Sequence, residues 1–185
     1  IKDDETLEIG NFTFTFFETP MLHWPDNTMA YLHEKRILFS SDAFGQHIAT
    51  SERFCDQLSE DMVLQEAKKY YANIISRYSA TVVRTLKKIL SKGLDIGMIA
   101  PAHGVSWRGD MIRRIIDTYM RWGSGISEEK VVIVYDTMWG STAKMAHAIA
   151  SGIMSGGLKT KVFNIRAIDR SDAITEVLDA CAVVI

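Results

Sequence analysis

Hydrophobic and polar residues alternate along the first part of the chain, in the pattern that half-buried strands produce. Phe12, Phe14 and Phe16 are separated by threonines, and short apolar runs follow at Met29–Leu32 and Ile37–Phe39. Every second side chain of a strand points to the same face, so this spacing predicts three short strands.

Helical spacing replaces this alternation in the middle of the chain. Apolar residues recur three and four positions apart within Glu60–Tyr78, Ala80–Leu90 and Asp110–Trp122, which predicts helices there. A short strand, Met98–Ala100, is expected between the last two helices. The first part of the chain is therefore expected to be a mixed α/β structure.

The pattern changes again after the small-residue stretch Gly123–Ser127, where we place a domain boundary. The expected domains are residues 1–126 and 127–185. A helix, a strand, a second helix and a further strand are predicted after the apolar strand Val131–Tyr135, at Ser141–Ser155, Lys161–Ile165, Asp172–Asp179 and Ala182–Ile185. This βαβαβ order is typical of the opening of a parallel, doubly wound sheet.

Composition indicates a globular protein and excludes several kinds of partner. Apolar residues make up 47% of the chain, yet no apolar run approaches the roughly 20 residues of a membrane span. There are 21 basic and 23 acidic residues, so neither nucleic acid nor an anionic membrane is an expected partner. Two distant cysteines without a CxxC pair indicate buried thiols and a reducing compartment, such as the cytoplasm.

The loop after strand Val131–Tyr135 has a pattern typical of anion binding. Its residues are Thr137, Met138, Trp139, Gly140, Ser141 and Thr142. The loop joins the carboxyl end of a parallel strand to the amino end of a helix, where free backbone N–H groups favour an anion. A nucleotide P-loop and a dinucleotide fingerprint are both absent. Phosphate binding is one interpretation, and simple capping of the helix by hydroxyls is the other.

Three candidate metal ligands come shortly after predicted strands: His23, Asp42 and His103. Imidazole suits iron or zinc, and a carboxylate can bridge two cations and neutralise part of their repulsion. Taken singly, each histidine is more often a surface or core residue than a ligand. The sequence does not assign a role to His47.

Taken together, these motifs resemble the metallo-β-lactamase-like domain of the flavodiiron proteins, followed by a flavodoxin signature. The segments that carry the resemblance are Met21–Asp26, Leu38–Gly45, Ala100–Gly104 and Ile133–Thr142. The resemblance covers essentially all 185 residues. It implies an α/β fold in which part of an αββα metallo-β-lactamase-like domain precedes the first βαβαβ of a flavodoxin-like parallel sheet.

The resemblance also implies a function and a role for each candidate residue. His23 would bind one iron, His103 would bind the other, and Asp42 would bridge them. The loop Thr137–Thr142 would hold the phosphate of FMN, and Trp24 would lie beside the metal site where flavin approaches. The implied reaction is reduction of O2 to water or of nitric oxide to nitrous oxide. Rubredoxin or a reduced deazaflavin would supply electrons to a homodimer or homotetramer.

This sequence departs from the family pattern because the His-x-Glu-x-Asp-His motif that supplies the other iron ligands does not occur in it. The chain also lacks an initiator methionine and stops on an apolar strand pattern, so we expect an internal part of a longer protein. Such a part alone should be inactive. A zinc-dependent hydrolase and a non-catalytic FMN electron-transfer module are the alternative functions.

Overall fold

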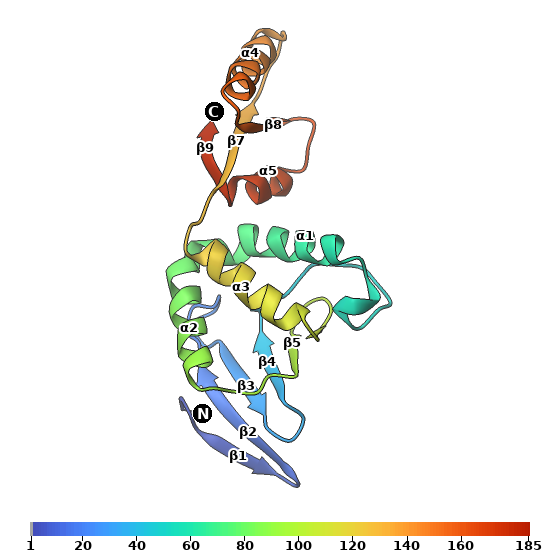
Figure 1. The fold of residues 1–185 in the computed structure, drawn as a ribbon, viewed down its shortest axis with the longest axis vertical. Coiled ribbons are helices and arrows are strands. Elements are labelled where there is room, and N and C mark those ends of the chain that lie inside the picture. Colours follow the sequence, from blue (N-terminus) through green and yellow to red (C-terminus); the bar gives the residue numbers. More distant parts are fainter. Residues whose placement is uncertain (1) are drawn as a thin grey trace. The chain divides into compact units, whose positions relative to one another are not determined.

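A six-stranded mixed sheet forms the first part of the molecule in the computed structural model, which describes residues 2–185 (Figure 1). Neighbouring strands in the sheet are also neighbours in the chain, in the order β1 (Thr6–Ile9), β2 (Phe12–Glu18), β3 (Thr28–Leu32), β4 (Ile37–Ser41), β5 (Met98–Pro101) and β6 (Trp107–Arg108). All pairs are antiparallel except β4 and β5, which are parallel. Consequently β2, β4 and β5 all run in the same direction.

Two of these strands, β1 and β6, are not predicted by the sequence pattern. β1 is exposed along its whole length, so it lacks the alternation that marks a half-buried strand. β6 has only two residues, and it is held by antiparallel pairing with β5 through Ile99 and Trp107. Both strands form because a neighbouring strand offers free hydrogen-bonding groups, which is a tertiary effect.

Three helices gather beside this sheet: α1 (Glu60–Tyr70), α2 (Ser79–Ser91) and α3 (Met111–Gly123) (Figure 1). The single helix predicted over residues 60–78 is interrupted. After α1 the chain forms a π-helical turn, Tyr71–Ile75, and then a short 3-10 turn. Buried residues continue through the π turn, because Tyr71, Ala72 and Ile75 extend the apolar face that Val63, Ala67 and Tyr70 form on α1.

The second part of the molecule forms a parallel βαβαβ unit, as predicted. Its elements are β7 (Glu128–Tyr135), α4 (Ser141–Ser155), β8 (Lys159–Asn164), α5 (Arg170–Val177) and β9 (Ala180–Val184). Within the described residues the strand order is β8-β7-β9, and both pairings are parallel. Val131 and Ile133 of β7 pack against Ala146 and Ala150 of α4, which places α4 on one face of the sheet.

The opposite face of β7 holds a buried ion cluster. Lys130 is only 5% exposed, and its Nζ lies 2.7 Å from Glu176 Oε2 of α5 and 2.7 Å from Asp179 Oδ1. Burial alone would lower the pKa of Lys130, but the hydrogen bonds and charges of the two carboxylates outweigh it and raise that pKa. Lys130 therefore stays charged at neutral pH and holds α5 to the sheet.

The two cysteines differ in exposure, although both are free thiols. Cys55 is buried, as expected. Cys181 is exposed, so the expectation of a buried thiol is wrong there. It lies on β9, an edge strand of the described sheet, where no further element covers the side chain.

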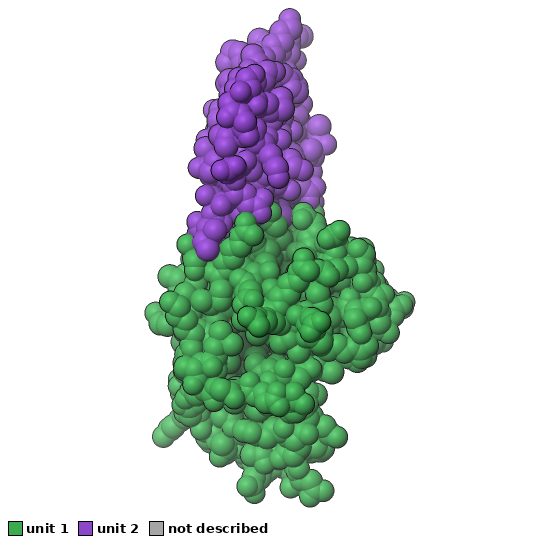
Figure 2. All heavy atoms as spheres, in the orientation of Figure 1, with its two compact units in different colours: residues 1–124 green, residues 125–185 purple. Residues whose placement is uncertain are grey.

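The chain divides into two compact units, Ile1–Ser124 and Gly125–Ile185 (Figure 2). The residues from 124 to 127 are all exposed. Within residues 2–185, no helix combines the length and the hydrophobicity that crossing a bilayer requires. The predicted boundary at residue 126 stays a prediction, and it can be tested in solution.

Limited proteolysis of the native protein should cut within Gly123–Ser127 before it cuts within Glu60–Leu90. The first segment includes four consecutive exposed residues, whereas the second contains fully buried side chains that resist local unfolding. Mass spectrometry of the early fragments gives the cleavage site. A first cut inside the helical region would contradict the boundary.

Candidate functional site

The candidate metal ligands are brought to one edge of the six-stranded sheet by strand direction. His23 lies in the loop after β2, Asp42 directly follows β4, and His103 follows β5. These three strands run the same way, so their carboxyl ends, and the loops that leave them, lie at the same edge. The sheet topology therefore places residues that are up to 80 positions apart in one location.

The three side chains converge on the carboxylate of Asp42. The Nε2 atom of His23 lies 3.5 Å from Oδ2, and the Nε2 atom of His103 lies 3.3 Å from Oδ1. The side chain of Asp42 is 14% exposed, whereas that of His103 is 47% exposed. Each imidazole thus faces its own oxygen of a largely buried carboxylate, and the cluster opens to solvent at His103.

The three side chains do not by themselves form a site for a single cation. Within residues 2–185, no three His, Cys, Asp or Glu side chains are gathered closely enough to hold a single ion. A carboxylate whose two oxygens face different imidazoles can instead bridge two metals, which in two-metal sites lie roughly 3.5–4 Å apart. Each metal would gain one nitrogen and one oxygen here, so its remaining ligands must come from elsewhere.

Buried side chains fix the loop that carries Asp42. The backbone N–H of Phe44 donates to the hydroxyl of Tyr119 on α3, and the indole N–H of Trp107 donates to the carbonyl of Phe44, both over 2.8 Å. Tyr119 and Trp107 are completely buried. Buried hydrogen bonds to α3 and β6 therefore fix the loop that carries Asp42. A metal site requires ligands that are oriented in this way by their surroundings.

Two aromatic side chains pack beside His103. The ring centroid of His47 lies 5.6 Å from that of His103 and 4.8 Å from that of Tyr70, each in an edge-on arrangement. Burial raises the pKa of the Tyr70 phenol, and the negative charge of Asp42 raises it further. Tyr70 therefore stays protonated at neutral pH. The sequence leaves His47 unassigned and gives no sign of Tyr70, because its helical position resembles any other core position.

Trp24 lies next to the cluster and is largely uncovered. Its ring centroid is 5.8 Å from that of His23, and the residue is 62% exposed. A surface hollow opens beside it, lined by Trp24, Asp26, Asn27, Thr28, Ser41 and Asp42. An aromatic surface is thus available beside the carboxylate for a planar ligand or a partner.

The loop Thr137–Thr142 joins β7 to α4 in the second unit, at the expected place. Gly140 is the residue that caps α4; it has a positive φ of 85°, and no side chain caps the helix. Its N–H donates to Thr137 Oγ1 over 2.9 Å. Met138 and Trp139 are 72% and 88% exposed. The amino end of α4 is therefore open to an anion, and its backbone donors carry the partial positive charge of the helix.

A nearby carboxylate is neutralised rather than left facing this loop. Asp136 precedes Thr137, and its Oδ1 lies 2.6 Å from the Nε of Arg166. Without that pairing, the negative charge would oppose an anion at the start of α4. The ion pair with Arg166 thus offsets the negative charge that a phosphate at this loop would otherwise meet.

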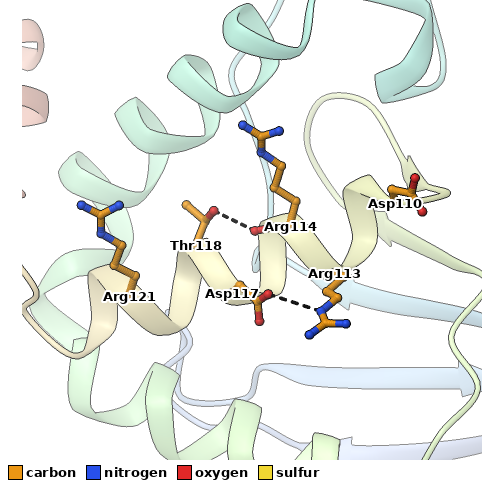
Figure 3. Close-up of a pocket in the computed structure, with 6 residues that line it drawn as sticks. All are labelled: Asp110, Arg113, Arg114, Asp117, Thr118 and Arg121. Carbon is orange, nitrogen blue, oxygen red and sulfur yellow. Dashed lines mark hydrogen bonds and ion pairs between the residues drawn. The ribbon is translucent and has the colours of Figure 1, made fainter.

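A further hollow lies on α3, and none of the candidate ligands lines it. Its residues are Asp110, Arg113, Arg114, Asp117, Thr118 and Arg121 (Figure 3). The Nε of Arg113 lies 3.6 Å from Asp117 Oδ2, one helical turn along. Exposed pairs of this kind contribute little to stability, and this hollow is a solvated helix face.

Comparisons with known proteins agree with both units. Residues 1–104 match the model of the ODP family beta lactamase, and residues 133–185 match that of flavodoxin. A nitric oxide reductase of Moorella thermoacetica is 47% identical over 185 residues, which are 100% of this chain and 46% of that protein. The chain therefore spans about half the length of this curated relative.

Two solved structures share the fold. The rubredoxin oxygen:oxidoreductase of Desulfovibrio gigas has a TM-score of 0.96 at 38% identity, over 99% of this chain and 46% of that one. The flavodiiron protein of Giardia intestinalis has a TM-score of 0.94 at 39% identity, over 99% and 44%. The match to the beta-lactamase family covers more than half of the chain, and the flavodoxin match covers its last residues, 133–185. The expected fold is confirmed, and the chain belongs to the flavodiiron proteins.

Proposed function

We propose that the protein to which this chain belongs reduces O2 to water, or nitric oxide to nitrous oxide, at a diiron centre that receives electrons through FMN. One observation carries the proposal. Two imidazole nitrogens face opposite oxygens of one carboxylate, in a chain that continues into a flavodoxin-like unit. Hydrolysis by zinc needs no electrons, so the second unit favours redox chemistry over a hydrolase.

His23 and His103 would each ligate one iron, and Asp42 would bridge the two. When bound, the irons would supply the site at which O2 or nitric oxide is reduced. The negative charge of Asp42 would offset part of the repulsion between the cations, and its low exposure would strengthen that effect. The protonated Tyr70 lies beside His103 and keeps its proton, so it adds no negative charge to the site.

Residues Thr137–Thr142 would hold the phosphate of FMN. The open amino end of α4 would supply backbone donors, and the hydroxyls of Ser141 and Thr142 would add to them. FMN would supply one-electron and two-electron redox chemistry. Trp24 would offer an exposed aromatic surface where a flavin approaches the metals.

The partners and the location follow from the same reasoning. We expect an electron donor such as rubredoxin, in line with the rubredoxin oxygen:oxidoreductase that shares this fold, or a reduced deazaflavin. A homodimer or homotetramer would bring one subunit's flavin to another subunit's metals. Two free thiols agree with a reducing cytoplasm, and no nucleic acid or membrane partner is expected.

In the full-length protein, Asp42→Asn should lower turnover of O2 or nitric oxide by about 10–100-fold, the usual effect of disturbing a metal's surroundings. The substitution removes the negative charge and keeps the shape, so thermal stability should change far less than activity. Asp95→Asn is the matched control, since it removes a surface carboxylate paired with Arg36 in the same unit. Full iron content and full turnover in Asp42→Asn would refute the bridging role.

Thr142→Val in the full-length protein should weaken FMN binding by about 1.5–3 kcal/mol, the range for a hydrogen bond to a charged group. Valine keeps the shape of the side chain and removes the hydroxyl donor. Titration of the apoprotein with FMN, followed by flavin fluorescence, gives the affinity. Thr160→Val on β8 is the control and should bind FMN normally, whereas an equal affinity in Thr142→Val would argue against a phosphate contact.

Metal analysis of the full-length protein should find about two irons per chain and little zinc. Removing iron with a chelator should abolish turnover while FMN remains bound, because the two sites use different residues. Zinc in place of iron, with hydrolytic activity, would support the alternative hydrolase.

A further inference from the structure

Gln46 is a buried amide between the loops that carry Asp42 and His103. It is 1% exposed. Its Nε2 donates to the carbonyl of Phe44 over 2.7 Å, and its Oε1 accepts from the backbone N–H of Val105 over 2.8 Å. Phe44 follows Asp42 by two residues, and Val105 follows His103 by two. Both ends of the amide are therefore used, one on each ligand loop.

Backbone hydrogen bonds join the same two loops on either side of this amide. The N–H of Gln46 donates to the carbonyl of His103 over 3.2 Å, and the N–H of Ala102 donates to the carbonyl of Ser41 over 2.7 Å. The first of these bonds links the two loops beside His103, and the second links them where β4 and β5 end. The side chain of Gln46 thus adds to backbone hydrogen bonds that already join the two ligand loops.

The loop that carries Asp42 and the loop that carries His103 are also in close contact, so a shift of one would displace the other. A Cβ atom on Gly104 would lie 2.3 Å from Gln46 Oε1 and 2.7 Å from the Gln46 carbonyl oxygen. A Cβ atom on Gly45 would lie 3.1 Å from the Asp42 carbonyl oxygen and 3.5 Å from His103 Cβ. Glycine at position 104 therefore permits the close approach of the two loops, whereas the contact of Gly45 with His103 is an ordinary van der Waals contact.

From this geometry we infer that Gln46 is a positioning residue that sets the spacing between Asp42 and His103, and through it the separation of the two metals. The inference rests on the proposed diiron function. Gln46 acts through the two ligand loops and not through the metals. Its neutral amide can donate on one side and accept on the other, which neither a carboxylate nor an ammonium group can do. The amide thus locks the loops without adding charge beside the bridging carboxylate.

The test uses the iron-loaded, full-length protein and the variant Gln46→Met, which keeps the length of the side chain and removes the hydrogen bonds of the amide to Phe44 and Val105. Iron retention during a challenge with a chelator should fall about tenfold, as expected when a ligand's supporting contact is lost. The Mössbauer spectrum of the iron that remains should change, because the spacing of the metals changes. FMN content and the circular dichroism spectrum should match those of the unchanged protein.

Tyr31→Phe is the control for a purely structural effect. It removes the 2.7 Å hydrogen bond from a buried tyrosine on β3 to the carbonyl of Asp95, which precedes β5, whereas His103 follows that strand. This variant should melt at a lower temperature and keep its iron and its Mössbauer spectrum. Gln46→Glu is the second variant: one oxygen can still accept from Val105, but the other faces the carbonyl of Phe44, so iron retention should fall in this variant as well.

Two results would overturn the positioning role. One is a folded Gln46→Met or Gln46→Glu protein with unchanged iron retention and an unchanged spectrum. The other is a spectral change of equal size in Tyr31→Phe, which would make the effect one of general stability. The unchanged protein serves as a separate check on the proposed function, because absence of iron from that sample refutes the diiron site itself.

Discussion

Strand direction is the constraint on which the metal cluster depends. β4 and β5 are parallel in a sheet that is otherwise antiparallel, and β2 runs in the same sense as both. A reversal of any of these strands would carry its ligand to the far edge of the sheet. Helices α1 and α2 lie within the connection from β4 to β5, because a parallel pair needs a long crossover. This crossover brings the loop after β4 and the loop after β5 to the same edge of the sheet.

The two units stabilise buried polar groups in different ways. In the first unit, neutral groups such as Gln46, Tyr119 and Trp107 satisfy the backbone of the ligand loops. In the second unit, the buried charge of Lys130 is balanced by two carboxylates. Neutral partners add no charge beside the Asp42 carboxylate, whereas the charged cluster of Lys130 lies near the start of β7, at the opposite end of that strand from the loop Thr137–Thr142.

Much of the fold and of the candidate site follows from local sequence pattern, and the remainder depends on contacts between distant residues. α4 begins and ends where the sequence predicts, because its caps and its apolar spacing are local signals. His23, Asp42 and His103 could be selected because each comes after a strand. The sequence gives no sign that Gln46 is a link between loops, since its partners lie two positions back and 59 positions ahead. For Cys181 the sequence predicts a buried thiol, and the structure shows an exposed one. The reason is that burial on an edge strand depends on whether another element covers it.

Gly104 has a consequence for how this site can change during evolution. Any side chain at this position would meet the carbonyl of Gln46 as well as its amide, so shortening residue 46 alone would not make room. The backbone of one ligand loop would have to shift, and the distance from His103 to the Asp42 carboxylate would shift with it. A single codon next to His103 thus constrains the spacing of the His23, Asp42 and His103 cluster. Selection on that spacing could act at this codon without replacing any of the three residues.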